Sequence, residues 1–379
     1  MKKEKKKSGM GIGVSLLFIF IGGLCGAVSA LYIDDALYEY GFLLGLAIQF
    51  ALMALAYFVH IIIHEAGHLV AGLMSGYSFG SFRIGSLMLI KQNGKLVLKK
   101  HSVVGTGGQC LMILPELKNG DFPAVFYNLG GVLMNLLVVF LSVLLSTVTR
   151  SIPIIYVFFV VMALMGIVVV LTNGIPLKLG MINNDGANTV EIIKSKEAKR
   201  FFYYQFKILE NINTGKRIRD IDGSLFPMPS DEGMKHSLSA SGAVFFENRL
   251  LDEGRFSDAV ELIDKLLSTK TALIGLHKLL LTADKISSLL ILGERTEEAH
   301  RLYTSEKYQS FKKQMKNNIS LVRVDFAHAL LYDKDENRAN EIYAEFQKCA
   351  ALHPYPSEIE GEEEILERIR AEYSTRKGA

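Results

Sequence analysis

The first half of the chain consists of long apolar runs, and the second half mixes apolar and polar residues at helical spacing. The apolar runs cover residues 11–33, 41–74, 125–148 and 152–171. Because about 20 consecutive apolar residues cross the hydrocarbon core of a bilayer as a helix, these runs predict four membrane spans. The first run follows a basic tail, but it is long for a signal peptide and lacks a clear small-residue cleavage site. We therefore expect a retained first span.

Lysine and arginine set the expected orientation, since cytoplasmic loops carry an excess of both. The N-terminal tail, the loop 76–122 and the segment after the fourth run are basic, whereas the loop 34–40 is acidic. Arg150, in the short turn between the third and fourth runs, is the exception. The pattern predicts a multi-pass protein of the cell membrane with both termini cytoplasmic. The compact four-span layout favours a bacterial plasma membrane.

The length of 379 residues fits about two domains. We expect a tail and first span at residues 1–40, a membrane-embedded core at 41–195 and a cytoplasmic all-α domain at 196–379. The predicted fold class is thus a multi-pass α-helical membrane protein followed by a domain of helical hairpins. A net charge of +3 is too small to indicate nucleic-acid binding. Three scattered cysteines do not form a disulfide framework or a cysteine metal site.

A β-hairpin is predicted in the loop between the second and third runs. Asn93-Gly94 separates two apolar, β-prone stretches, residues 87–90 and 96–98, and Asn-Gly is a strong hairpin signal. The open edge of such a hairpin could bind an extended substrate strand. A structural flap is an equally good interpretation, and the sequence leaves both open.

The C-terminal half contains a weak internal repeat. Ala259, Ala299 and Ala339 are 40 residues apart in both steps, and each follows a turn and lies in an amphipathic helix. This pattern resembles a tetratricopeptide-like array of helical hairpins, with small residues at the packing points and a period longer than the usual 34. Such arrays offer a concave surface to a cytoplasmic partner or peptide. A plain helical domain without a partner is the alternative.

The chemistry-bearing motif lies in the second apolar run and reads His64-Glu65-Ala66-Gly67-His68. Residues four apart share a helix face, so His64 and His68 can present two imidazoles to one zinc ion, with Glu65 placed to accept a proton from water. The run from 41 to 59 is uncharged, and ionisable residues within a span are expensive enough to indicate function. The alternative is a solvated cluster at the helix end, in the headgroup region.

Two histidines do not complete a catalytic zinc site, which uses three protein ligands and one open position. Asp185 is the obvious third candidate, because Pro176 should break the fourth span and let the chain turn back. The alternative for Asp185 is a polar cap at the start of a helix beginning near Ala187. His60 competes as a ligand, but three histidines one turn apart do not converge easily on one ion. We interpret His60 as a supporting or access residue.

Taken together, these motifs resemble the site-2-protease family of intramembrane zinc metalloproteases. The resemblance covers roughly residues 41–195 and rests on His64-Glu65-x-x-His68, Gly131-x-x-x-Asn135, and Asn173-x-x-Pro176 leading to Asp185-Gly186. It implies one Zn²⁺ per chain held by His64, His68 and Asp185, and Glu65 as catalytic base. It also implies that Asn135 and Asn173 support the substrate or the reaction centre.

The expected function is therefore hydrolysis of a peptide bond in or near the membrane-spanning segment of a protein or peptide substrate. Membrane-anchored regulators and signal-peptide or pheromone precursors are the substrate types that the resemblance suggests. A non-catalytic membrane scaffold, with a partner bound to the helical domain, is the main alternative, and the intact Glu65 argues against it. A metal transporter would need ionisable residues along several spans, whereas here they gather at one end.

Overall fold

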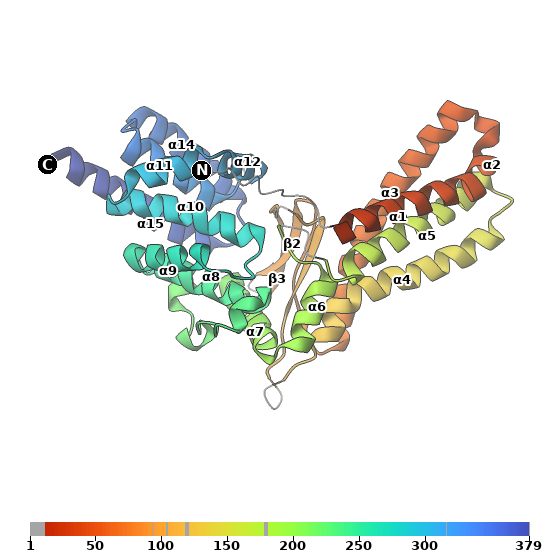
Figure 1. Ribbon diagram of the computed structural model, residues 1–379, viewed down its shortest axis with the longest axis horizontal. Coiled ribbons are helices and arrows are strands. Elements are labelled where there is room, and N and C mark those ends of the chain that lie inside the picture. The colour runs from red at the N-terminus through yellow and green to blue at the C-terminus, as the bar shows by residue number, and fades with distance from the viewer. Residues whose placement is uncertain are drawn as a thin grey trace. The chain divides into compact units, whose positions relative to one another are not determined.

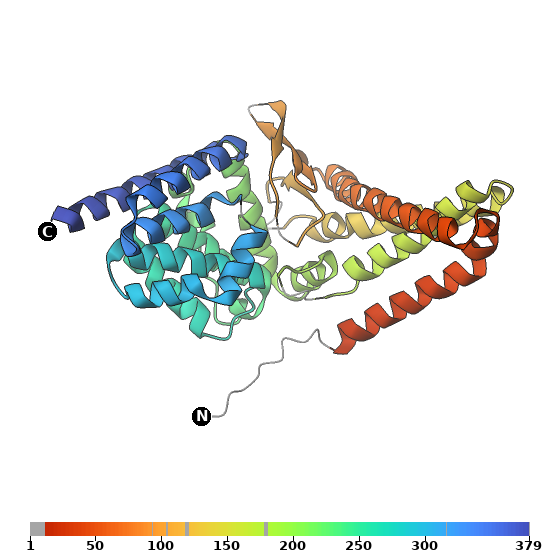
Figure 2. The same ribbon diagram turned by 90° about the horizontal axis from the view of Figure 1, so that it is seen from above.

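The computed structural model describes residues 12–92, 94–103, 105–117, 121–177, 181–315 and 317–378. It is mostly helical, 74%, with a small antiparallel sheet (Figures 1 and 2). Chain contacts divide it into two compact units. The first comprises Met1–His68, Leu129–Leu177 and Asn184–Ala187, and the second comprises Leu69–Asn128, Lys178–Asn183 and Asn188–Ala379.

Apolar helices build the first unit. They are α1 (Ile12–Val28), α2 (Asp34–Leu37), α3 (Phe42–Met74), α4 (Ala124–Val148) and α5 (Pro153–Gly174), and the last residues of α3 and the first of α4 belong to the second unit. A π-turn (Ser29–Ile33) joins α1 to α2. Among the described residues, four helical segments are long and apolar enough to cross a membrane: Ile19–Tyr40, Phe42–Met74, Ala124–Val148 and Pro153–Gly174. The four predicted apolar helices are therefore confirmed as helices.

The segment 34–40 differs from the sequence expectation, because it is helical and not a loop. It forms α2 and a short 3₁₀ turn, Tyr38–Tyr40. Asp34 and Asp35 occupy the first turn of α2.

Helix α5 is the centre of the first unit. In the most apolar stretch of α5, 50% of the residues are buried, whereas in the other three candidate spans the share is 11–17%. Val157 and Val161 of α5 pack with Ile33 and Ala56 in one apolar cluster. The other helices expose many large apolar side chains. Leu43 of α3, for example, is 79% exposed, and Leu136 of α4 is 52% exposed. Apolar surface on this scale is unusual for a soluble monomer and indicates membrane association.

The second unit contains a four-stranded antiparallel sheet with the order β3-β2-β1-β4. Its strands are β1 (Ser78–Ile84), β2 (Leu87–Gln92), β3 (Lys95–Lys100) and β4 (Gly108–Ile113). The predicted hairpin is confirmed as β2 and β3, with Leu89 opposite Leu98, while Asn93 of its turn lies outside the described residues. Strands β1 and β4 were not predicted. Buried Arg83 ties them together by donating to Gly85 O and Gly108 O.

The rest of the second unit is helical. Its helices are α6 (Asp185–Lys194, of which the first turn belongs to the first unit), α7 (Lys196–Asn213), α8 (Ser237–Asp252), α9 (Phe256–Ser268), α10 (Gly275–Leu292), α11 (Thr296–Thr304), α12 (Glu306–Gln314), α13 (Ile319–Ala327), α14 (Glu336–Leu352) and α15 (Pro356–Gly378). Three short 3₁₀ turns (Ile218–Asp220, Gly223–Leu225 and Gly233–Lys235) lie between α7 and α8, and a π-turn (His328–Tyr332) follows α13.

Three helical hairpins carry the repeat. They are α8–α9, α10–α11 and α13–α14, and the helices of each pair pack on each other. Ala259, Ala299 and Ala339 lie on the second helix of successive pairs, and each is at most 2% exposed. The three alanines are thus packing points, as predicted. Helix α12 lies between the second and third hairpins.

Candidate metal centre

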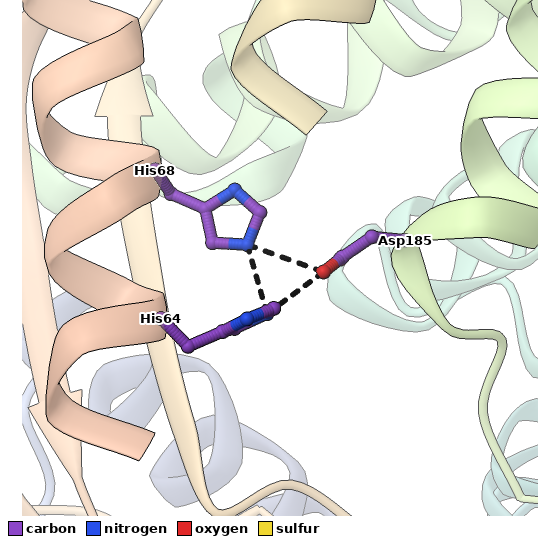
Figure 3. A group of neighbouring side chains, drawn as sticks. All are labelled: His64, His68 and Asp185. Carbon is purple, nitrogen blue, oxygen red and sulfur yellow. Dashed lines mark hydrogen bonds and ion pairs between the residues drawn. The ribbon is translucent and has the colours of Figure 1, made fainter. Parts of the chain in front are cut away.

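The three predicted ligands lie together in the first unit (Figure 3). His64 Nε2 is 2.8 Å from Asp185 Oδ2, and His68 Nε2 is 3.3 Å from both Asp185 Oδ2 and His64 Nε2. The histidines lie one turn apart on α3 and point toward the start of α6. His64 is 8% exposed and His68 is 7% exposed, so water has little access to either ring. Three potential metal-ligand atoms therefore meet where both rings are buried and the Asp185 side chain is 22% exposed.

The end of α5 and the start of α6 position Asp185. Helix α5 ends at Gly174, and Ile175 takes an extended conformation before Pro176, as a residue preceding proline should. Asn184 then caps α6, because its Oδ1 accepts from Ala187 N at 2.9 Å and from Leu177 N at 3.1 Å. The capping role considered for Asp185 thus falls to Asn184, and the Asp185 carboxylate lies against the two histidines instead.

Asn184 also fixes the connection from the other side. Its Nδ2 donates to Thr172 O at 2.7 Å and to Ile175 O at 2.6 Å, two carbonyls at the open end of α5. The last carbonyls of a helix lack partners within the helix, so these bonds satisfy groups that would otherwise need water. One side chain therefore joins the end of α5 to the beginning of α6 and sets the reach of Asp185.

The spacing of the three ligand atoms fits a tetrahedral zinc ion. Zinc binds imidazole nitrogen and carboxylate oxygen at about 2.0–2.1 Å, which separates the ligand atoms of a tetrahedron by about 3.3–3.4 Å. Two of the three separations are 3.3 Å and the third is 2.8 Å. The donor set of two imidazoles and one carboxylate is also a recognised catalytic zinc set, with a fourth position left open.

The electrostatics of Asp185 favour an anionic ligand. Burial by itself raises the pKa of this carboxyl, but the charge of His68 and hydrogen bonds from His64 and His68 outweigh burial. The pKa of Asp185 therefore lies well below its ordinary value. A carboxylate that stays ionised at neutral pH is the form that binds a cation.

A second layer of contacts supports His64. The Nδ2 atom of Asn135 in α4 lies 3.0 Å from His64 Nδ1. The Oδ1 atom of the same side chain lies 2.8 Å from His60 Nδ1. His60 Nε2 lies 2.8 Å from Met162 O of α5. His60 and Asn135 are fully buried. Both nitrogens of His60 are thus engaged away from the three-ligand group, which agrees with its interpretation as a supporting residue.

The remaining predicted residues are placed differently. Glu65 follows His64 on α3 and is 8% exposed, inside the same buried region of the chain. The side chain of Asn173 donates to Val169 O of its own helix at 3.0 Å, a bond within α5 and not to the ligand group. The predicted roles of Glu65 and Asn173 stay predictions.

Sequence reasoning missed two contributors, Asn184 and the Met162 carbonyl. Asn184 had a signal, because an Asn directly before Asp-Gly and a helical segment is a good N-cap. The Met162 carbonyl had none. It lies 102 residues from His60 in the chain, and a backbone oxygen leaves no trace in the residue type.

No protein-family model, no curated protein and no solved structure matches this chain.

Proposed function

We propose that this protein is an intramembrane zinc metalloprotease of the site-2-protease type. The observation that carries the proposal is the convergence of His64 Nε2 and His68 Nε2, on an apolar helix, with Asp185 Oδ2 at mutual separations of 2.8–3.3 Å. A zinc ion held by these three residues would polarise the scissile carbonyl and lower the pKa of a water molecule. The donor set leaves room for such chemistry, since the protein supplies three ligands and not four.

Glu65 is the proposed general base. Its place beside His64 on the helix gives it the position that the glutamate of an H-E-x-x-H motif needs to take a proton from the attacking water. The same carboxyl then returns the proton to the leaving amine. His64, His68 and Asp185 position the reaction, and Glu65 moves the proton.

The proposed substrate is a membrane-spanning protein or peptide. The candidate spans turn apolar side chains outward, and we propose that the chain crosses the cell membrane four times, with both termini cytoplasmic. A helical substrate backbone has its carbonyls in hydrogen bonds, so the substrate must unwind locally before attack. Substrates with glycine or helix-breaking residues near the cleaved bond should therefore react fastest.

The helical hairpins of the second unit are proposed to bind a cytoplasmic partner or the substrate's cytoplasmic part. Stacked hairpins with small residues at their packing points support this role, since arrays of this kind recognise extended peptides along one face. The exposed edge strand β3 is a second candidate for contact with an extended substrate segment.

A paired assay on the detergent-purified full chain tests the proposal. Zinc per chain and cleavage of a glycine-containing membrane-spanning peptide would be measured for the wild type, Glu65→Gln and Asp185→Ala. We expect Glu65→Gln to keep zinc and to lose cleavage by at least about 100-fold, in the range of a lost general base. Asp185→Ala should lose zinc. The exposed Glu261→Gln and Asp258→Ala serve as matched controls that change neither readout.

The scaffold alternative makes the opposite prediction. If Glu65→Gln and the wild type behave alike in cells, and no membrane substrate accumulates in the variant, the protein would act by binding alone. A wild type that binds no zinc would overturn the proposal altogether.

A further inference from the structure

His60 is the most deeply buried ionisable residue of the apolar helices that the proposed reaction leaves without a role. It is 0% exposed, and each of its ring nitrogens has one partner, Asn135 and the Met162 carbonyl. Asn135 in turn contacts His64 Nδ1, the nitrogen that faces away from Asp185. A continuous chain of contacts therefore runs from a backbone carbonyl of α5 to a ligand of the proposed centre.

The direction of hydrogen bonding along this chain is fixed at its far end. A carbonyl oxygen can only accept, so His60 Nε2 must carry a proton and donate it to Met162 O. In the structure the amide oxygen of Asn135 faces His60 Nδ1. A neutral His60 that donates from Nε2 is an acceptor at Nδ1, so it needs the NH₂ group of Asn135 there, and a half-turn of the amide supplies that group. The same half-turn replaces the Asn135 NH₂ group at His64 Nδ1 with the amide oxygen, and His64 Nδ1 must then carry a proton. His64 Nε2 is left with its lone pair, as metal binding requires.

The opposite orientation of the amide removes the free lone pair of His64 Nε2. With the Asn135 oxygen toward His60, the orientation that the structure has, both nitrogens of His60 must donate, which makes it a buried cation among apolar helices. The Asn135 NH₂ group then faces His64 Nδ1, and the proton of His64 moves to Nε2, where it points at Asp185 Oδ2. The two ends of an amide have the same shape, so a half-turn of Asn135 interconverts the two arrangements without moving a helix.

We propose that His60 is a positioning residue that, through Asn135, holds His64 in the tautomer that binds the metal. This inference rests on the proposed zinc centre and adds to it a reason for the polar pair His60 and Asn135. The energetic preference is for neutral histidines, because a charged ring among these apolar helices is costly. The neutral arrangement is also the one that opens His64 Nε2.

The packing around His60 supports a built position for its ring. A Cβ at Gly166 of α5 would lie 2.7 Å from Cε1 and 2.9 Å from Nε2 of His60. Real side-chain atoms do not approach so closely, so only glycine at 166 leaves space for this imidazole beside the Met162 carbonyl. The helix that supplies the acceptor therefore also supplies the room for the ring.

Two substitutions at 60 separate the proposed role from simple space filling. His60→Leu fills similar space but can neither donate nor accept. His60→Gln keeps one donor for Met162 O and one acceptor for the Asn135 NH₂ group, so it preserves the direction of the chain. Gln49→Leu is the matched control. It also removes a polar contact of α3, the hydrogen bond from Gln49 to Ser29, but this bond is not one of the contacts that link Met162 to His64.

The experiment measures zinc affinity by competition with a chelating dye, on the detergent-purified full chain. We expect zinc to bind about 10–100-fold more weakly in His60→Leu, the usual effect of losing the partner of a ligating histidine. His60→Gln should recover most of the affinity, and Gln49→Leu should match the wild type. In zinc-loaded wild type labelled with ¹⁵N-histidine, His60 should be protonated at Nε2 alone.

Each other outcome contradicts the inference. Equal affinity in His60→Leu and wild type would remove the role of His60 and leave the zinc centre standing. Equal losses in His60→Leu and His60→Gln, or a similar loss in Gln49→Leu, would reduce His60 to packing. A doubly protonated His60 in the zinc-loaded protein would refute the bonding direction. A wild type that binds no zinc would instead contradict the centre itself.

Discussion

Each unit of this protein contains a buried polar cluster. The two clusters differ in how the free-energy cost of burying their charged and polar groups is offset. The cluster of the apolar helices joins His60, Asn135, His64, His68 and Asp185. The cluster of the helical domain joins Glu247, Asp284, Arg323 and Glu362, all at most 9% exposed. Polar groups without partners are expensive to bury, so each cluster must account for every charge it holds.

The helical domain supplies its own cation. Arg323 pairs with Asp284 through Nη2, and its Nη1 lies 3.3 Å from Glu362 Oε2. Neither carboxyl oxygen of Glu247 has a hydrogen-bond partner within the described part of the chain. Burial raises the pKa of all three carboxyls, and for Glu247 the charge of Asp284 adds to the effect. This cluster therefore limits its excess negative charge by retaining protons.

The apolar helices supply none of the fixed positive charge that Arg323 gives the other cluster. Their three converging ligand atoms belong to two imidazoles and a carboxylate. The contacts behind His64 can be satisfied with neutral groups alone once the Asn135 amide makes the half-turn proposed above. Lone pairs that converge in a buried place are stabilised by an external cation. One cluster is thus a structural ion group, whereas the other brings together three ligand atoms that we propose receive a metal.

The largest effect is expected from Arg323→Met. It leaves Asp284 and Glu362 buried without their cation, and breaking one partner of a buried ion pair costs about 3–5 kcal/mol. Hydrogen exchange should show the domain of α8–α15 destabilised by that amount, with zinc binding unchanged. Arg338→Met is the control, because the Arg338 side chain is 60% exposed. Loss of zinc in Arg323→Met would contradict the independence of the two clusters.

The next effect is expected from Gly131→Ala in the apolar helices. A Cβ at 131 would lie 2.5 Å from Cε1 of His64, so the ring must move out of its ligand position. We expect zinc affinity to fall by about 10–100-fold, as for other losses of ligand orientation, without a change in the unfolding of the helical domain. Gly23→Ala, where a Cβ meets no atom within 4 Å, is the control for an added methyl group in an apolar helix. Unchanged zinc affinity in Gly131→Ala would show that His64 does not need this position.

A smaller effect is expected from pH on the helical domain. Glu247, which faces Asp284 and Arg323, has a pKa above its ordinary value of 4.5 because of burial. Between these two pKa values the folded state holds a proton that the unfolded state releases. The contribution of Glu247 to stability is therefore fully present at low pH and falls as pH rises from 4.5 through the raised pKa. Glu247→Gln removes this ionisation. Compared with wild type it should lose less stability between pH 5 and pH 8, and gain about 1 kcal/mol at pH 8.

Urea unfolding at several pH values, followed by circular dichroism, measures the difference. The exposed Glu261→Gln should reproduce the wild-type slope. A Glu247→Gln variant that is less stable than wild type at pH 8 would mean that the carboxylate is stabilised there.

An effect of similar size is expected from Asn184→Ala. It removes the cap of α6 and the two bonds to the end of α5, and losing an N-cap costs about 0.5–2 kcal/mol. Asn184→Asp keeps the capping oxygen but sets a carboxylate oxygen against the carbonyls of Thr172 and Ile175, so it should not recover the stability. Thermal unfolding with and without zinc measures both. Equal stability of the wild type, Asn184→Ala and Asn184→Asp would show that Asn184 does not hold the connection that positions Asp185.

The sequence predicted those features that depend on local periodicity. The four apolar helices, the hairpin of β2 and β3 and the packing points Ala259, Ala299 and Ala339 each leave a pattern within a few turns of chain. His64 and His68 could be paired because a helix fixes residues four apart on one face. Asp185 followed from the break at Pro176.

Features that depend on distant contacts could not be predicted. Strands β1 and β4 contain Gly80, Ser81 and Arg83 and are strands because they pair with each other and with β2, not because of an apolar pattern. The link from His60 to His64 passes through Asn135, and its far end is a backbone carbonyl on another helix. Neither the partner nor the direction of those bonds is encoded in local spacing.

The most direct test of the account is X-ray absorption at the zinc edge on the zinc-loaded full chain and on Asp185→Ala. For the wild type, the account predicts two imidazole nitrogens and one carboxylate oxygen at about 2.0–2.2 Å, with an open fourth position. Asp185→Ala should have lost its zinc or retain it without the carboxylate. A sulfur ligand in the wild type, or the same spectrum in both proteins, would contradict a centre built from His64, His68 and Asp185.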